Sequence, residues 1–530
     1  GELLKMDDEN NNWQQPEIKN RELNKYNWLV LHKENLKLSR NTDIGAFSLL
    51  DASESISIGE NVKIGSHCSL YSRTDIDNKK GKIILEKNSS LGSHCVVMPG
   101  ITIGENSIVG AMSFVNKDIP ANEVWIGSPA QCLKKIMNNN NGGEIEKTNQ
   151  WKIPLFKTEW SEDNVEAVNK VIRRGTHWAA GPEIEEFEKK LAEFNGVKYA
   201  LTFNSGTSAL FAMYKAIGVE GKEVIVPSFT FIATANAIIL AGGIPIFAES
   251  EEETLGLDAE DVERKITANT KAIVALHYAG GVSKDIEKLK EIANKHNIHL
   301  LEDNAHSLGV RKNGKLCGTF GIASILSFCQ NKLITTGEGG AVITDSQHLY
   351  EKMKLIRSHG RVDNGQDYFS TTDEMEYLEV GHNFRMSSMN AALGSSQLNH
   401  FNEIMQSRIS SASYLNQKLS EFKDIEVPKP YLNSNHFYQM YTIKLKNKEN
   451  RDKLQKHLTE NKIMSRIYYS PIHLTKFYQK KKCKKGELPK TEEISNRILT
   501  LPMYPGIPKE ELDLIINSIK EFMQRGREDA

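Results

Sequence analysis

The sequence has no long hydrophobic run, no excess of charge of either sign and no framework of cysteines. No apolar stretch reaches the roughly 18 residues that a membrane-spanning helix needs. The formal net charge at pH 7 is −1, from 67 basic and 68 acidic side chains, so electrostatics gives no reason to expect nucleic acid or a membrane as a partner. Six unevenly spaced cysteines and the lack of a signal-peptide pattern favour the cytosol. No metal-ligand motif is present, and we expect no metal ion.

A six-residue period dominates the first part of the chain. Neither the α-helix, with its period of 3.6, nor the β-strand, with its period of 2, produces such a spacing. It is typical of hexapeptide β-helices, in which each aliphatic side chain stacks inside a three-sided coil. Two shorter sets precede the long one, and the positions are Ile44, Leu50, Ile56, then Ile58, Ile64, Leu70, and finally Leu85, Leu91, Val97, Ile103, Val109 and Val115.

This stretch resembles the left-handed β-helix acyltransferases, down to the segments at 115–120 and 126–130 near its end. The resemblance implies a trimer that binds acetyl-CoA in grooves between subunits. Many such enzymes carry a catalytic histidine in a loop that reads Thr-His-Pro-Ile-Asp. The matching segment here, residues 73–77, reads Arg-Thr-Asp-Ile-Asp, so that Thr74 stands where the histidine would be.

Two other histidines are candidates for the missing base. His67 and His94 occur in identical tetrads, each reading Gly-Ser-His-Cys. If residues 71–83 form an extruded loop, the two rings stack at one corner of adjacent coils, about one strand spacing of ~4.8 Å apart. We prefer His94 as the base because it follows the loop. Two alternatives stay open: both are surface corner residues, or the proton goes to solvent or to a carboxylate such as Asp75.

One lysine in the second part of the chain lies between an apolar run and a glycine-rich turn. Residues 323–328 predict a strand that enters a pocket, and residues 339–344 predict a strand that leaves it. Lys332 lies between them. A lysine that condenses with an aldehyde cofactor needs a fixed backbone and a partly desolvated pocket that favours the neutral amine. Lys332 is therefore a candidate Schiff-base residue, although a lone lysine is usually a solvated surface group.

Two further segments complete a candidate site for pyridoxal 5'-phosphate. The strand at 199–203 is followed by Ser-Gly-Thr at 205–207 and a helical pattern, which together offer backbone N–H groups to a phosphate at a helix start. An ordinary helix cap is the alternative. The strand at 298–302 ends in Asp303, with His306 close behind. A carboxylate at the C-terminal end of such a strand can keep the pyridine nitrogen protonated.

From about residue 151 to the C-terminus the chain resembles the DegT/DnrJ/EryC1/StrS sugar-nucleotide aminotransferases, a branch of the fold-type I pyridoxal phosphate enzymes. The matching motifs are residues 181–188, 205–207, 227–231, 302–303, 331–340, 381–386 and 501–505. The resemblance implies a role for each of the following residues: Lys332 as the Schiff-base residue and proton shuttle, Asp303 under the pyridine nitrogen, Phe231 stacked on the ring, Gly206, Thr207 and Ser327 at the phosphate, His306 near the ring hydroxyl, and Asn383 at the phosphate of the neighbouring subunit.

Within that family the resemblance also narrows the reaction. Dehydratase members carry a histidine in place of the lysine, so Lys332 argues for an aminotransferase. The blocks at 331–340 and 381–386 resemble enzymes that aminate C4 of 4-keto-6-deoxy sugars rather than C3. We expect glutamate as the amino donor and a nucleotide-linked keto sugar as the acceptor. Which nucleotide and which sugar configuration are used is not encoded in any motif.

The predicted fold class is multidomain, a left-handed parallel β-helix followed by an α/β fold-type I aminotransferase. The predicted segments are a lead-in at 1–40, the β-helix at 41–137, a polar linker at 138–150, the large cofactor-binding domain at 151–400 and a small C-terminal domain at 401–530. We predict a bifunctional enzyme that aminates and then N-acetylates a nucleotide sugar. In the alternative, the β-helix is only a trimerisation scaffold. Two-fold and three-fold contacts together predict a hexamer.

Overall fold

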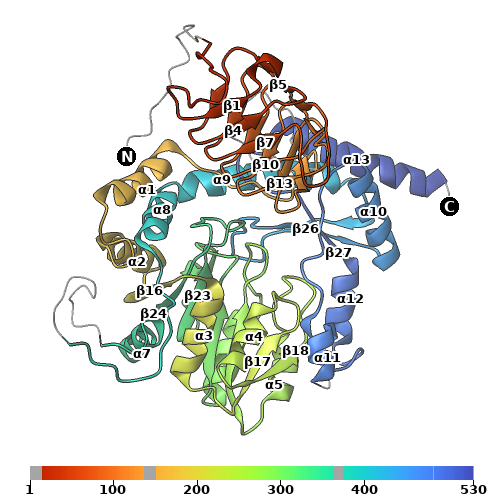
Figure 1. Ribbon diagram of the computed structural model, residues 1–530. Coiled ribbons are helices and arrows are strands. Elements are labelled where there is room, and N and C mark those ends of the chain that lie inside the picture. Colours follow the sequence, from red (N-terminus) through yellow and green to blue (C-terminus); the bar gives the residue numbers. More distant parts are fainter. Residues whose placement is uncertain (1–14, 136–150, 363–373, 482, 529–530) are drawn as a thin grey trace. The chain divides into compact units, whose positions relative to one another are not determined.

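The computed structural model describes residues 15–135, 151–362, 374–481 and 483–528. The chain divides into two compact units, Gly1–Glu146 and Lys147–Ala530. The linker predicted at 138–150 lies outside the described residues. The predicted multidomain fold class is confirmed, since the first unit is a coil of short strands and the second is an α/β structure (Figure 1).

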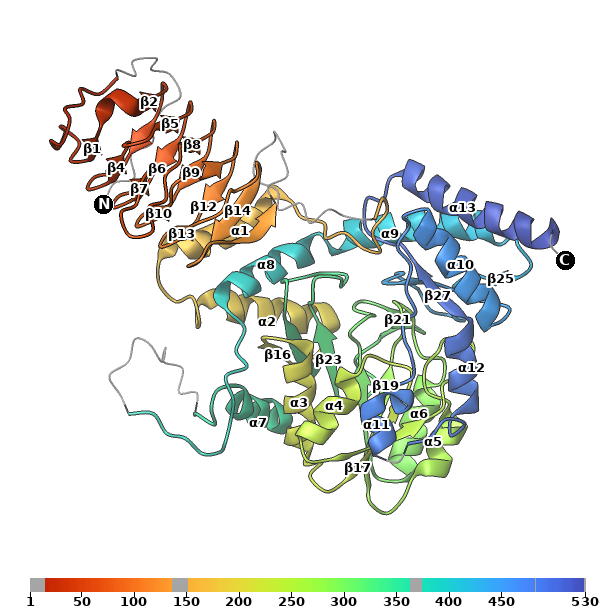
Figure 2. The ribbon, with the colours of Figure 1, turned by 45° about the vertical axis from the view of Figure 1, so that its right-hand side comes forward.

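The first unit is a parallel β-helix with three faces (Figure 2). One face stacks β1 (Leu29–Leu31), β4 (Leu49–Asp51), β7 (Ser69–Tyr71), β10 (Val96–Val97) and β13 (Phe114–Val115). The second stacks β2 (Leu36–Leu38), β5 (Ile56–Ile58), β8 (Ile83–Leu85) and β11 (Thr102–Ile103). The third stacks β3 (Asp43–Ile44), β6 (Lys63–Ile64), β9 (Ser90–Leu91), β12 (Ile108–Val109) and β14 (Glu123–Ile126), with β15 (Gln131–Lys135) antiparallel at its end.

The aliphatic residues of the six-residue period fill the interior of this coil. Leu50, Leu70, Val97 and Val115 are fully buried on one face, and Ile64, Leu91 and Val109 are buried on another. Burying an aliphatic side chain of this size contributes about 1.5–3 kcal/mol before entropy is counted. The interior stack therefore supplies the driving force that holds strands of only two or three residues in register.

The coil begins earlier than the predicted boundary at residue 41. Strands β1 and β2 lie inside the segment that we expected to be a lead-in, and they pair in parallel with β4 and β5. The six-residue period does not reveal them because the first coils are longer than three hexapeptides. Val30 pairs with Leu50, and Leu50 with Leu70, whereas later in the coil Ile84 pairs with Thr102.

The second unit contains a seven-stranded sheet in the order β16 (Tyr199–Phe203), β24 (Gly340–Thr344), β23 (Ala323–Ser327), β20 (His299–Asp303), β19 (Thr270–Leu276), β17 (Glu223–Pro227), β18 (Ile244–Ala248). Only β24 runs antiparallel to its neighbours in this sheet. Both faces are buried, because neighbouring residues of a strand point to opposite sides: Ile225 enters the core on one face, and Val224 and Val226 enter the core on the other.

Helices cover both faces of this sheet (Figure 1). The core on one face includes residues of α2 (Pro182–Asn195), α5 (Ala259–Lys265), α6 (Ile286–Lys295) and α8 (Ser388–Asn399). The core on the other face includes residues of α3 (Gly206–Ile217), α4 (Ala233–Leu240) and α7 (Gln347–Arg357). Helix α1 (Glu162–Arg174) packs on α8, and β21 (Arg311–Lys312) pairs with β22 (Lys315–Leu316) in a hairpin.

The C-terminal part forms its own small sheet of β25 (Ile425–Glu426), β26 (Tyr441–Leu445) and β27 (Ile498–Leu501), all antiparallel. Its core includes residues of α9 (Phe401–Leu419), α10 (Lys448–Glu460) and α13 (Lys509–Glu528). Ile153 is fully buried in this same core and bridges to Ile463. The chain after residue 151 therefore starts in the small part and not, as we expected, in the large domain.

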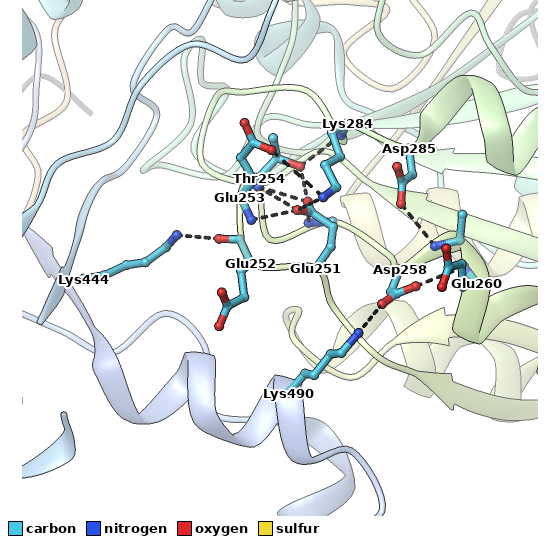
Figure 3. Close-up of polar contacts among 12 residues, drawn as sticks. Glu251, Glu252, Glu253, Thr254, Asp258, Glu260, Lys284, Asp285, Lys444 and Lys490 are labelled. Carbon is cyan, nitrogen blue, oxygen red and sulfur yellow. Dashed lines mark hydrogen bonds and ion pairs between the residues drawn. The ribbon is translucent and has the colours of Figure 1, made fainter. Parts of the chain in front are cut away.

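Charged contacts fasten the small part to the edge of the seven-stranded sheet (Figure 3). Lys444 of β26 donates to the backbone oxygen of Glu252, in the loop after β18. Lys490, in α12 (Pro489–Arg497), donates to Asp258 over 2.9 Å. The carboxylate of Glu251 accepts from the N–H groups of residues 253, 254 and 256, and so holds that loop in shape. These contacts fix how the small part presents its residues to the large one.

Candidate functional site

Lys332 lies in the turn that follows β23, where the sequence places it between two strands. Its backbone N–H donates to the oxygen of Cys329 over 2.9 Å, and Gln439 of the small part donates to the oxygen of Asn331. The backbone around the lysine is therefore fixed from both parts of the unit. Burial lowers the pKa of the Lys332 amine to about 8, although the charge of nearby Asp303 acts in the opposite direction. A substantial fraction of the amine is neutral near physiological pH.

Asp303 ends β20 and is 4% exposed. Its Oδ2 accepts a hydrogen bond of 2.8 Å from the hydroxyl of Thr234, and its Oδ1 accepts one of 3.2 Å from the N–H of Ala305. Burial raises the pKa of the Asp303 carboxyl, and the hydrogen bonds from Thr234 and Ala305, with the charge of Lys332, oppose that shift. An aspartate held in this way can face a cationic group without turning toward solvent.

The start of α3 forms an anion cradle, as the sequence predicts. Ser205 is the N-cap, and its hydroxyl accepts from the N–H of Ser208 over 3.0 Å. A side chain added at Gly206 would lie 3.3 Å from the hydroxyl of Ser327, and one at Gly340 would lie 2.6 Å from the N–H of Gly206. Glycine at both positions thus lets the ends of β23 and β24 approach the helix start, where Thr207 is exposed. Unpaired N–H groups at such an end attract phosphate.

His306 lines the same small pocket as Lys332 and contacts the small part. Its Nε2 is 3.1 Å from the hydroxyl of Tyr469, and the two rings stack with centroids 6.0 Å apart and an interplanar angle of 11°. Burial and the charge of Lys332 hold the pKa of His306 well below its usual value, so the ring is neutral. Its Nδ1 is buried with no hydrogen-bond partner among the described residues. Buried polar atoms are normally hydrogen-bonded, so we expect a ligand to supply the partner of this nitrogen.

Phe231 and Tyr469 form an aromatic wall next to this histidine. The Phe231 ring is 57% exposed, and its centroid lies 6.2 Å from that of Tyr469. An exposed phenylalanine beside a buried polar pocket has a free face on which a flat ring can stack. This agrees with the stacking position expected for Phe231.

The residues of this pocket fit pyridoxal 5'-phosphate. The fit rests on four features, which are the partly neutral amine of Lys332, the buried carboxylate of Asp303, the unpartnered Nδ1 of His306 and the helix start at Gly206. They supply in turn the groups that an aldehyde, a pyridine nitrogen, a ring hydroxyl and a phosphate require.

Asn383 is exposed, and its backbone contacts Asn204, the residue that precedes the start of the α3 cradle. Its backbone oxygen accepts from Asn204 of the same chain over 3.3 Å, and residues 358 and 383 form an antiparallel bridge. The prediction that its side chain reaches the cofactor of a neighbouring subunit stays a prediction.

A cavity of about 960 Å³ lies elsewhere, between α2 and α7, whereas the enclosed space beside Lys332 measures about 10 Å³. The chemistry of the lining, not the volume, marks the site.

The two histidines of the β-helix stack as the sequence predicts. The rings of His67 and His94 are 4.7 Å apart with an interplanar angle of 3°, and the ring of Phe47 lies 5.2 Å from that of His67. Both histidines are exposed, and their backbones take φ values of 60° and 61° at the corner of the coil. Stacking at adjacent coils is confirmed. A chemical role for the pair is not decided by this geometry.

The extruded loop is also present, between β7 and β8. Arg73 and Lys80 form an antiparallel bridge at its base. The hydroxyl of Thr74 donates to Asp77 within the loop, and Asp75 is almost fully exposed, 3.6 Å from Arg73. Thr74 therefore cannot serve as a base, and Asp75 remains available to solvent.

No cluster of His, Cys, Asp and Glu suited to a metal ion occurs in the described part of the chain.

These features define the second unit as an α/β enzyme with a buried amine and a phosphate cradle. The chain belongs to the DegT/DnrJ/EryC1/StrS aminotransferase family, whose model matches residues 158–520. The model for bacterial transferase hexapeptide repeats matches residues 82–117. The protein is thus a fusion of a hexapeptide-repeat domain with an aminotransferase of this family, as the sequence predicts.

Relatives of known name match the second unit. A GDP-perosamine synthase of Escherichia coli O157:H7 is 34% identical over 371 residues, 70% of this chain and 98% of the relative. The UDP-4-amino-4,6-dideoxy-N-acetyl-beta-L-altrosamine transaminase of Helicobacter pylori is 34% identical over 338 residues, 63% of this chain and 88% of the relative. Among solved structures, Helicobacter pylori PseC, an aminotransferase involved in the biosynthesis of pseudoaminic acid, has a TM-score of 0.66 at 31% identity and covers 70% of this chain and 99% of its own.

Three residues at the site carry no signal in the sequence. Thr234 holds Asp303, Gln439 holds the backbone next to Lys332, and Tyr469 contacts His306. Gln439 and Tyr469 lie more than a hundred residues from the groups that they contact, in segments without a motif. Only the packing of the small part against the sheet brings them there.

Within the described ranges, no helix is both long and apolar enough to cross a membrane.

Proposed function

We propose that the second unit transfers an amino group from glutamate to C4 of a nucleotide-linked 4-keto-6-deoxy sugar, and that the first unit then acetylates the new amine with acetyl-CoA, both in the cytosol. The observation that carries the first activity is the buried Lys332 next to Asp303 and the α3 start in a chain of this family. The names of the perosamine synthase and of the 4-amino-4,6-dideoxy sugar transaminase support a 4-amino product.

Each residue of the pocket has a distinct task in this reaction. Pyridoxal 5'-phosphate, when bound, accepts the amino group from the donor and passes it to the keto sugar, with its ring as an electron sink. Asp303 would face the ring nitrogen and favour its protonated form. Gly206, Thr207 and Ser327 would hold the phosphate, and Phe231 would cover one face of the ring. Lys332, partly neutral because it is buried, takes and returns the proton that must move between two carbon atoms.

The acetyl transfer requires less of the protein. The lone pair of the sugar amine attacks the thioester carbon of acetyl-CoA, the carbon–sulfur bond breaks, and CoA leaves as a thiolate that ends as the thiol. The proton lost by the attacking nitrogen passes to a ring nitrogen of His94. The stacked ring of His67, 4.7 Å away, holds the His94 imidazole in place at the corner of the coil.

The second candidate is a monofunctional aminotransferase, for C3 or C4, whose β-helix only assembles trimers. Two observations favour it. Thr74 occupies the position of the usual loop histidine, and both corner histidines are exposed to solvent. An amine can also lose its proton to solvent or to Asp75. A bifunctional enzyme that acetylates without a histidine base is therefore a third possibility.

One experiment separates these functions. The protein is incubated with glutamate and with dTDP-, UDP- or GDP-4-keto-6-deoxy sugar, with and without acetyl-CoA, and the products are followed by mass spectrometry. Conversion of keto to amino sugar is expected in both reactions. A further gain of one acetyl group only in the presence of acetyl-CoA is expected for the bifunctional enzyme, and amination alone would establish the scaffold function. No amination with any of the three sugars would overturn the first proposal.

A further inference from the structure

Tyr469 belongs to the small part and contacts the expected cofactor site through His306. The centroids of the His306, Phe231 and Tyr278 rings lie 6.0, 6.2 and 6.4 Å from that of Tyr469. Its hydroxyl oxygen is 3.1 Å from Nε2 of His306, and the carbonyl oxygen of its own residue accepts a hydrogen bond from Ser495 over 3.1 Å. The side chain is thus anchored by its backbone and by aromatic packing on several sides.

The direction of the hydrogen bond to His306 follows from the chemistry of the two groups. Burial raises the pKa of the Tyr469 hydroxyl well above its usual value, so the hydroxyl keeps its proton. The His306 ring is neutral, because burial and Lys332 disfavour its charge. A neutral imidazole has one N–H and one acceptor nitrogen. A phenol is the stronger acid of the two neutral donors, so the Tyr469 hydroxyl donates and Nε2 accepts.

The proton of His306 then lies on Nδ1, the atom that is buried without a partner among the described residues. A buried N–H without an acceptor is unfavourable, so a ligand must supply the acceptor for the ring to keep this form. The charge of Lys332 acts on His306, and Tyr278, Tyr468, Asp303 and Arg466 act on the hydroxyl of Tyr469. Lys332 and Asp303 are the charged groups among these that belong to the expected cofactor site. Both have tasks of their own at the cofactor.

We propose that Tyr469 is a positioning residue that fixes His306 in the tautomer with the proton on Nδ1, so that Nδ1 donates to an anionic oxygen of the bound cofactor. This inference rests on the proposed cofactor site. Through His306, the small part would then influence the charge on the cofactor oxygen, in addition to any contact with the sugar. The residue acts through His306 and takes no part in a covalent step.

The test is Tyr469→Phe, which removes one oxygen atom and keeps the ring that packs on Phe231 and His306. A donor to the cofactor oxygen stabilises the form in which the Lys332 nitrogen has lost its proton. Tyr469→Phe leaves the tautomer of His306 unfixed and so weakens this donation, and we expect the pH midpoint of the visible absorbance of the bound cofactor to rise by about 0.5 to 1 unit, up to the equivalent of one ordinary hydrogen bond. We expect kcat to fall about three- to tenfold with KM for the keto sugar within about twofold.

Tyr468→Phe is the matched control, because the hydroxyl of Tyr468 contacts the exposed Arg466 and not His306. It should leave the midpoint unchanged. The variants His306→Phe and His306→Phe/Tyr469→Phe complete a double-mutant cycle, in which Tyr469→Phe should add no further shift once His306 is absent.

An unchanged midpoint in Tyr469→Phe, an equal shift in Tyr468→Phe, or a full additional shift in the double variant would each overturn the proposal. The absorbance titration needs bound cofactor but no sugar. A wild-type protein that binds the cofactor and shows these shifts, yet aminates none of the sugars, would leave the positioning role standing while the proposed substrate fails.

Discussion

At the scale of single residues, the site depends on how burial changes two ionisable groups. Burial lowers the pKa of the Lys332 amine, and burial raises the pKa of the Asp303 carboxyl while the hydrogen bonds from Thr234 and Ala305 oppose that shift. Sequence motifs place both residues near a cofactor, but neither motif states the protonation state. The hydrogen bonds and the burial decide it.

We expect Lys332→Ala to abolish amino transfer, because no other amine in the described pocket can take the proton between the two carbons. The acetylation of an amino sugar added to the reaction should continue at the wild-type rate. Both activities can be followed by liquid chromatography of the nucleotide sugars. Residual amino transfer above about a thousandth of the wild-type rate would contradict the assignment of the proton shuttle to this residue.

The lowered pKa of Lys332 has a measurable consequence for stability. The ordinary pKa of 10.5 applies to the unfolded chain, and the folded pKa is about 8. Between these values the unfolded chain binds more protons than the folded one, so the free energy of unfolding rises with pH across this window. In the cofactor-free protein the increase from pH 8 to pH 10.5 should exceed that of Lys332→Met by on the order of 2–3 kcal/mol.

Denaturant titrations of the two cofactor-free proteins at several pH values measure this difference. Groups that do not interact with Lys332 titrate alike in both proteins and cancel in the comparison. Parallel stability curves for wild type and Lys332→Met would show that the amine is not desolvated in the folded state.

At the scale of elements, the β-helix shows how a corner of the coil aligns side chains from adjacent turns. His67 and His94 hold the same position in successive turns, and parallel pairing of their flanking strands sets the rings 4.7 Å apart. Histidine is tolerated at the left-handed backbone geometry of this corner at modest cost. The corner thus presents two imidazoles to solvent whether or not they act in catalysis.

We expect His94→Ala to lower the rate of acetylation by roughly 10²-fold or more, the usual contribution of a general base, and to leave amino transfer unchanged. His67→Ala is the matched variant, since it removes the stacking partner at the same corner and should cost less than about tenfold. Initial rates with acetyl-CoA and an amino sugar supply the measurement. Should both variants retain more than a tenth of the activity, the proton goes to Asp75 or to solvent.

At the scale of the whole molecule, the two units imply two kinds of symmetry. Hexapeptide β-helices are expected to form three-fold contacts, and Asn383 is expected to complete the site of a neighbour across a two-fold axis. The side chains near Asn383 support such a contact, because Leu378 is 58% exposed and Val380 is 90% exposed. Closed contacts of both kinds produce a hexamer of D₃ symmetry.

Light scattering of the full chain is expected to report a mass near six chains, and cleavage within residues 138–150 should release dimers and trimers separately. Val380→Glu should break the two-fold contact and leave trimers, because a buried unpaired carboxylate is costly. Leu432→Glu serves as the control and should remain hexameric. Leu432 is 74% exposed and lies in the small part, away from Val380 in the sequence. A full-length chain that stays dimeric at micromolar concentration is incompatible with this assembly.

The sequence by itself determined the two folds and the central residues of the aminotransferase site. The six-residue period predicts the coil because each aliphatic residue must face a narrow interior, and this pattern is local. The lysine block, the Ser-Gly-Thr turn and Asp303 are likewise local, since each sits where a strand ends. The stacking of His67 and His94 could be predicted because the coil repeats. Once residues 71–83 are treated as an extruded loop, the two histidines take the same position in adjacent coils.

Only the tertiary structure decided what surrounds those residues. The first coil escaped prediction because its turns are longer than three hexapeptides, and Ile153 joined the small part through a core built from distant segments. Thr234, Gln439 and Tyr469 reach the site across more than sixty residues of sequence, and no local pattern records such contacts. The pKa of Lys332 and the tautomer of His306 depend on these neighbours, because burial and hydrogen bonding arise only when the parts of the chain pack together.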